Sequence, residues 1–227
     1  MKNIKIKNII IGKQYESSEN YQKFLKIVNG KKINVYVVQK GERINIEKDL
    51  YIDILWPNEK DMIVDNWINN NSLVFKLVYK DFSIMFTGDI EEEAEKAILE
   101  QYSNNINKLQ ANVLKIAHHG SKTSTTDDFL KTISPKIALI GVGKNNNFGH
   151  PNEQVIERLK KNGVKVYRTD TDGEISILWI KMYKFHYFVN TRKQWRWEYE
   201  KKIFYNLNGD YIVFKFCNND ISSSIKQ

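Results

Sequence analysis

The stretch "SLVFKLVYKDFSIMFTGD", residues 72–89, predicts two strands joined by a tight turn near Lys80 and Asp81. Apolar residues alternate or run together on both sides of the turn, as half-buried and fully buried strands require. The next segment, residues 90–102, predicts a helix with acidic residues in its first turn, where the helix dipole favours negative charge. Asp89 therefore lies where a buried strand ends and a helix follows.

Strand and helix patterns continue on both sides of this stretch. Strands that alternate with helices predict an α/β (α+β) fold in which helices cover a sheet. Residues 164–180 predict a hairpin turned on Asp172 and Gly173, and residues 3–11 predict a buried strand. The remaining segments are predicted as strands at 33–39, 42–47, 50–57, 112–117 and 136–143, and as helices at 18–30, 124–133 and 151–163.

The composition is that of an ordinary globular protein, with 41% hydrophobic and 27% charged residues in 227. No apolar run approaches the ~20 residues that span a bilayer, which predicts no transmembrane segment. The N-terminus lacks the features of a secretory signal. As written, the sequence predicts a cytoplasmic protein, or an extracellular one if it is part of a longer parent. The single cysteine, Cys217, excludes an internal disulfide framework and a cysteine-rich zinc site.

A composition shift near residue 181 predicts a main domain over 1–180 and a basic, aromatic, β-rich tail over 181–227. The tail holds nine Lys and Arg against four Asp and Glu, so it supplies +5 of the net charge of +8. Such a tail could bind nucleic acid through phosphate contacts and stacking, or form a small β-module that its lysines keep soluble. Residues 195–216 resemble one copy of the aromatic cell-wall-binding repeats, whose stacked aromatics bind choline-like cations. The alternative is a terminal β-hairpin or meander packed on the domain.

Three short stretches place a metal-capable side chain at or just beyond the C-terminal end of an apolar strand. They are "FTGDI" with Asp89, "IAHHGS" with His118 and His119, and "NFGHP" with His150. In α/β sheets, ligands and catalytic groups converge on that edge. Carboxylates and imidazoles are ligands of zinc and manganese. The sequence therefore predicts a divalent-metal site at this edge.

Each of these residues also has a structural interpretation. Asp89 could cap the helix that begins at Ile90. The histidine pair could place one ring in the core and the other in solvent. His150 could be a loop residue that Pro151 holds extended. The fourth histidine, His186, is predicted as an ordinary strand residue.

The elements "TGD" at 87–89, "HHGS" at 118–121 and "GHP" at 149–151, in this order and spacing, resemble the C-terminal half of the metallo-β-lactamase-like domain of ComEC-type competence proteins. The resemblance runs from roughly Ile4 to Ile177 and is looser before residue 72. It implies part of an αββα sandwich and metal-dependent hydrolase chemistry of the phosphodiester or nuclease type. It also implies a role in competence and DNA uptake, with DNA as substrate and zinc or manganese as cofactor.

The resemblance implies a role for each site residue. Asp89 matches a catalytic carboxylate that bridges two metals. His118 or His119 matches a histidine ligand, with the choice between them open, and His119 also counts among the catalytic residues. Ser121 matches a substrate-pocket position, and His150 matches a catalytic histidine near the substrate phosphate.

One element of the family pattern is missing. The family carries an H-x-H-x-D-H or H-x-D-x-D-H motif in its first half, and here all four histidines lie at 118 or later. We therefore expect an N-terminally truncated domain with too little metal affinity for occupancy and little or no hydrolysis alone. An apolar face left uncovered would need the missing half or a homodimer. The rival interpretation is a non-catalytic remnant or binding protein whose tail contacts nucleic acid or the cell wall.

Overall fold

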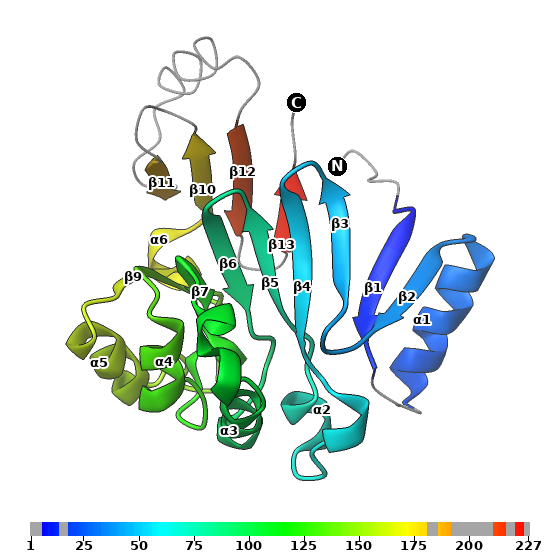
Figure 1. The fold of residues 1–227 in the computed structure, drawn as a ribbon, viewed down its shortest axis with the longest axis horizontal. Coiled ribbons are helices and arrows are strands. Elements are labelled where there is room, and N and C mark those ends of the chain that lie inside the picture. The colour runs from blue at the N-terminus through cyan, green and yellow to red at the C-terminus, as the bar shows by residue number, and fades with distance from the viewer. Residues whose placement is uncertain (1–5, 14–17, 181–185, 192–210, 217–220, 225–227) are drawn as a thin grey trace.

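The fold is built on one mixed sheet of seven strands. The computed structural model describes residues 6–13, 18–180, 186–191, 211–216 and 221–224. The strand order is β3–β4–β5–β6–β7–β8–β9, antiparallel from β3 to β6 and parallel from β6 to β9 (Figure 1). The predicted hairpin of residues 72–89 is confirmed as β5 and β6. The strands are β3 Arg43–Glu47, β4 Leu50–Trp56, β5 Val74–Tyr79, β6 Phe82–Phe86, β7 Val113–Lys115, β8 Ile137–Ile140 and β9 Lys165–Arg168.

Three helices cover one face of this sheet: α3 (Glu92–Gln101), α4 (Asp127–Ile133) and α5 (Glu153–Lys161) (Figure 1). Their buried residues form one core with alternate residues of the central strands, including Met85 and Leu114. Phe129 of α4 is almost fully buried in this core, and its truncation to alanine would cost about 3–5 kcal/mol. The predicted α/β class, with helices over a sheet, is confirmed.

A second sheet covers the opposite face of the main sheet. Its strand order is β11–β10–β12–β13. Ile175 and Ile177 of β10 are fully buried and belong to one cluster with Ile84, Val113 and Leu139 of the main sheet. The layers therefore run helix, sheet, sheet, as a partial αββα sandwich predicts. The strands are β10 Ile175–Ile180, β11 His186–Thr191, β12 Tyr211–Phe216 and β13 Ile221–Ser224.

The N-terminal unit stands apart from these layers. β1 (Asn8–Gly12) and β2 (Asn34–Val38) form a separate parallel pair, connected by α1 (Glu19–Gly30). The strand predicted at 3–11 is present as β1, over Asn8–Gly12, but the prediction that it is buried is wrong, because its side chains are exposed or half-buried. The reason is that β1 pairs with β2 alone and lies outside the two main cores. Tyr36 and Val37 of β2 are more than half exposed, whereas Ile84 and Met85 of β6 in the main sheet are fully buried.

The hairpin predicted at residues 164–180 is wrong. β9 pairs with β8 in the main sheet, whereas β10 belongs to the second sheet. The segment between them forms a helical turn, α6 (Thr169–Asp172), in which the Asp172 carboxylate accepts from the Arg168 backbone N–H at 2.9 Å. Thr169 Oγ1 accepts from Val142 N–H at 2.8 Å, which fixes this turn to the loop that follows β8.

The described parts of the tail are strands, and His186 lies in β11 as expected of a strand residue. β11 and β12 pair with opposite edges of β10. The boundary placed near residue 181 stays a prediction, and so does the cell-wall repeat, most of which lies outside the described residues. Among the described residues, no helix has the length and apolar character needed to cross a bilayer.

Candidate active site

The predicted site residues gather at the edge of the main sheet where β6, β7 and β8 end. Asp89 follows β6, His118 and His119 follow β7, and His150 lies in the loop after β8. His119 Nε2 lies 3.8 Å from Asp89 Oδ1. The centroid of the His118 ring lies 5.7 Å from that of His150 and 6.5 Å from that of His119. Three neighbouring strands thus bring together the four side chains that the sequence singled out.

Asp89 does not cap the following helix, because α3 has Glu91 as its N-cap residue. The Asp89 side chain is instead 45% exposed at the site. Gly88 before it has φ of 55°, and a Cβ there would lie 2.7 Å from Ser72 Cβ. The Gly88 carbonyl accepts from the His118 backbone N–H at 3.1 Å. Glycine is therefore needed at this turn, which joins the Asp89 loop to the histidine loop.

His118 and His119 both adopt the left-handed backbone conformation, with φ of 46° and 54°. A non-glycine residue in this region costs roughly 1–3 kcal/mol, and such residues cluster at functional sites. Gly120 follows with φ of 83°, and a Cβ on it would lie 2.7 Å from Pro151 Cβ. Strain at two consecutive histidines favours a functional interpretation of the pair over simple packing.

One hydrogen bond fixes the tautomer of His119. Its Nδ1 lies 2.5 Å from the Gly141 carbonyl oxygen, and because a carbonyl only accepts, Nδ1 carries the proton. In the neutral ring the lone pair is then on Nε2, the nitrogen 3.8 Å from Asp89 Oδ1. A backbone carbonyl that orients one nitrogen and frees the other is typical of metal-ligating histidines.

His118 faces a carboxylate that the sequence analysis missed. Its Nδ1 is buried and lies 3.2 Å from Glu91 Oε1, but the two atoms do not form an aligned hydrogen bond. Glu91 Oε1 accepts from Thr123 Oγ1 at 2.9 Å, and Oε2 accepts from Asn66 Nδ2 at 2.6 Å. Ser121, the predicted pocket residue, is buried, and its Oγ shares a hydrogen bond with Thr123 Oγ1 at 2.9 Å. Its hydroxyl thus belongs to the same polar network.

A second missed carboxylate holds the loop that follows the histidines. Glu95 is fully buried and accepts from the backbone N–H groups of Thr125 and Thr126 at 2.5 and 2.7 Å. Burial raises the pKa of Glu95, and the hydrogen bonds from Thr126 and Thr125 oppose that shift. Glu91 and Glu95 lie four residues apart, so the i, i+4 spacing in "IEEEAE" was the signal that could have placed both on one side of the helix end.

His150 lies in a loop that Asn146 closes. Asn146 Oδ1 accepts from the His150 N–H at 3.0 Å, and Asn146 Nδ2 donates to the His150 carbonyl at 2.8 Å. Burial, followed by the nearby charges of His118 and His119, lowers the pKa of His150. The Phe148 ring, 82% exposed, stacks on His150 with 6.1 Å between ring centroids. Sequence reasoning missed this exposed aromatic ring beside the site.

A half-buried lysine, also missed, lies at the end of β7. The Lys115 ammonium donates to the Ile116 carbonyl at 2.9 Å. Its Cε packs against Gly141, where a Cβ would lie 3.2 Å from it. Burial lowers the pKa of Lys115 to about 8, and the negative charge of Asp89 opposes that shift. The site thus includes the Lys115 ammonium, which lies in a segment that the sequence predicts as an apolar strand.

The described residues supply only part of a metal site. Among them, no group of three or more His, Cys, Asp or Glu side chains is arranged to hold a metal ion. The facing donors are the Asp89 carboxylate and His119 Nε2, whereas zinc usually takes about four ligands. The implied zinc or manganese ion does not fit these residues alone.

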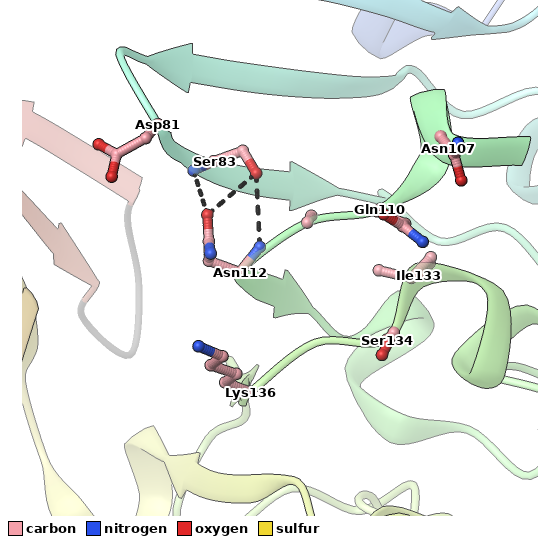
Figure 2. Close-up of a pocket in the computed structure, with 9 residues that line it drawn as sticks. Asp81, Ser83, Asn107, Gln110, Asn112, Ile133, Ser134 and Lys136 are labelled. Carbon is pink, nitrogen blue, oxygen red and sulfur yellow. Dashed lines mark hydrogen bonds between the residues drawn. The ribbon is translucent and has the colours of Figure 1, made fainter. Parts of the chain in front are cut away.

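The opposite edge of the main sheet holds a polar depression of about 400 Å³ (Figure 2). It lies where β6, β7 and β8 begin. Asn112 Oδ1 accepts from Ser83 N–H at 2.7 Å and from Ser83 Oγ at 3.2 Å, which ties the residue before β7 to the beginning of β6. Lys136 and Asp81 also line it, and no histidine does. The depression is therefore separate from the candidate active site.

Comparison with known proteins places the chain beside competence proteins. No family model matches it. It is 34% identical over 175 residues to ComE operon protein 3 of Bacillus subtilis, covering 77% of this chain and 22% of that protein. It is 34% identical over 123 residues to competence protein ComA of Neisseria gonorrhoeae, covering 54% of this chain and 17% of that protein. Recombination protein 2 of Haemophilus influenzae is 30% identical over 128 residues, covering 56% and 15% of the two chains.

A solved structure of a predicted metal-dependent hydrolase from Parabacteroides distasonis aligns with a TM-score of 0.42 and 16% identity, covering 72% of this chain and 64% of that one. A likeness at this level carries no conclusion about the site. The curated relatives are much longer, and the chain spans about a fifth of the length of the first two. The chain is therefore similar, over most of its own length, to one segment of competence proteins.

Proposed function

We propose that this chain forms one side of a metal-dependent phosphodiester hydrolase site of the ComEC type. The observation that carries the proposal is the convergence of Asp89, His118, His119 and His150 at the edge where β6, β7 and β8 end. The free Nε2 of His119 beside the Asp89 carboxylate supports a ligand role for both. The resemblance to competence proteins supports the same class of chemistry.

The donors divide between metal and substrate. Asp89 and His119 would hold a zinc or manganese ion together with donors other than the described residues. Such an ion would supply a bound water of lowered pKa and would stabilise charge on phosphoryl oxygens. The pKa of His150 is lowered, which favours its neutral form, and the N–H of a neutral imidazole can hydrogen-bond a phosphate oxygen. Ser121 would line the substrate pocket.

Nucleic acid is the proposed substrate class. The exposed Phe148 ring beside His150 offers a stacking surface for a base next to the phosphate site. Base–aromatic stacking contributes roughly 1–3 kcal/mol per base. Phe148→Ala should therefore weaken binding of a short single-stranded DNA about tenfold. Fluorescence anisotropy with Tyr36→Ala as an exposed aromatic control would measure it, and equal losses in both variants would remove nucleic acid from the proposal.

The chain alone is proposed to bind metal weakly and to hydrolyse little or nothing. Two facing donors hold an ion less tightly than the four of a complete zinc site. Added Mn²⁺, which broadens nearby proton signals, should selectively broaden the ring resonances of His119 and His118 in the NMR spectrum. Asp89→Ala should abolish that broadening. Selective broadening at the opposite edge of the sheet, or none at millimolar Mn²⁺, would refute the site.

A hydrolysis assay provides a second test of the proposed function. We expect no turnover of a generic phosphodiester by the purified chain with Zn²⁺ or Mn²⁺. Stoichiometric metal with turnover that Asp89→Ala abolishes would overturn the proposed inactivity and support a complete catalyst. The rival function, a non-catalytic binding protein, predicts DNA binding that Asp89→Ala and added metal leave unchanged.

A further inference from the structure

Glu91 lies where three segments of the chain meet, although it was expected only to complement the dipole of α3. Its side chain is 14% exposed, and its backbone N–H donates to Asn70 Oδ1 at 3.0 Å. Asn70 is itself fully buried. One carboxylate oxygen is held by Asn66 and the other by Thr123. The carboxylate is therefore fixed before any ligand arrives.

This carboxylate has room for one more donor. An ionised carboxylate offers about four lone-pair positions, and the hydrogen bonds that Glu91 accepts from Asn66 and Thr123 use two. The His118 Nδ1 lies 3.2 Å from Oε1, is buried, and has no aligned partner. Among the described contacts, no other acceptor is recorded for this nitrogen.

We propose that Glu91 is a positioning residue that keeps the proton of neutral His118 on Nδ1, leaving the Nε2 lone pair free. In the opposite tautomer the Nδ1 lone pair would face a carboxylate oxygen, which is an unfavourable contact between two acceptors. An unpaired buried acceptor costs enough to bias the tautomers by about tenfold or more. His119 reaches the same tautomer through Gly141, so both histidines would present Nε2.

The tautomer follows from this contact whether or not the chain is a hydrolase. Its use, as a second Nε2 available for a metal ion, rests on the proposed function. Carboxylates that orient a ligating histidine in this way change metal affinity by 10–100-fold. The tautomer of His118 can therefore be measured without metal, and the effect of Glu91 on metal affinity can be measured separately.

The first test is a two-dimensional ¹⁵N–¹H spectrum of the imidazole rings of the full chain without metal. At about pH 8.5 an ordinary imidazole is neutral. We expect protonated Nδ1 in both His118 and His119. A protonated Nε2 in wild-type His118 would overturn the proposal at once, with no variant needed.

Variants give the second test. In Glu91→Gln, Asn66 Nδ2 can only donate, so the amide oxygen should turn toward it and the new NH₂ toward His118. The His118 tautomer should then invert, while His119 stays unchanged. Glu91→Leu removes the acceptor and should abolish the preference. Glu93→Gln, an exposed acid in the same helical turn, is the matched control and should change neither ring. An unchanged His118 tautomer in both Glu91 variants would overturn the proposal.

The last test adds metal. If His118 is a ligand, Glu91→Gln should weaken Mn²⁺ affinity about tenfold relative to Glu93→Gln. If Glu91→Gln inverts the His118 tautomer but leaves the Mn²⁺ affinity unchanged, only the role of His118 in metal binding is refuted. Absence of Mn²⁺ binding in the wild type would refute the proposed function and leave the tautomer result standing.

Discussion

The two edges of the main sheet are built from the same strands, but their loops are held differently. Where β6, β7 and β8 end, left-handed backbone falls on His118 and His119. Where these strands begin, it falls on Lys80 and Ser134, which close the β5–β6 turn and end α4. Left-handed residues at such chain reversals are common. A chain reversal alone does not explain two consecutive strained histidines. Left-handed backbone at one edge therefore serves to reverse the chain, whereas at the other edge we attribute it to the candidate site.

The strongest way to break this comparison is Gly120→Ala. A Cβ at this position would lie 2.7 Å from Pro151 Cβ, and φ is 83°. We expect a loss of about 3 kcal/mol in the free energy of unfolding. Gly143→Ala is the control, because a Cβ there has no heavy atom within 4 Å, and it should change stability by less than about 0.5 kcal/mol. Equal small effects in urea unfolding would mean that the histidine loop is not tightly held.

Glu95→Ala should have the next largest effect. It leaves two backbone N–H groups without their partner, at a cost of about 2 kcal/mol near neutral pH. The folded-state pKa of Glu95 is raised above the ordinary value of 4.5. The fold therefore favours the protonated form, a contribution present below 4.5 and lost as pH rises through the folded pKa. The gap between wild type and variant should narrow as pH rises, and a gap that widens would contradict this assignment.

Asn112→Ala tests the opposite edge. It removes the acceptor of Ser83 N–H and Ser83 Oγ, both neutral donors, so the expected loss is about 1 kcal/mol. A loss larger than that of Glu95→Ala in the same unfolding assay would reverse the ranking of the two edges.

The smallest expected effect is a change in the pH dependence of stability, and it should differ between two lysines, one from each edge of the sheet. Lys115 is half-buried with a pKa lowered to about 8, so between about pH 8 and the unfolded value of 10.5 the unfolded chain binds more protons. Wild-type stability should rise with pH across that window, and Lys115→Met should remove the rise. At neutral pH the Met variant should be more stable by under about 1 kcal/mol. Lys136→Met, at an exposed position, should keep the wild-type pH profile.

The sequence predicted the elements between residues 72 and 163, along with the meeting of Asp89 and the three histidines. Apolar runs that end on polar residues, in a chain where strands and helices alternate, leave few arrangements of a sheet. The sequence did not predict that β9 and β10 belong to different sheets, because a strand pattern does not indicate which sheet the strand joins. Ile175 and Ile177 enter the core opposite the helices only because distant strands offer an apolar face.

Glu91, Glu95 and Lys115 were missed for a related reason. The two acids look like ordinary charges in the first turn of a helix, and their partners lie about 30 residues away along the chain. Lys115 occupies one position in an apolar strand, and only the folded structure shows that its side chain is half-buried and that its Cε packs against Gly141. The proposed metal donors were visible by residue type, but the groups that orient those donors are visible only in three dimensions.

β10 has neighbours on both of its edges, β11 on one side and β12 on the other. A chain shortened after Ile180 would keep this strand anchored by its isoleucines but strip the hydrogen-bonding partners from both edges. Bare, apolar strand edges template association with other chains. Clipping between β10 and the later strands should therefore increase self-association of the chain before any site residue is disturbed.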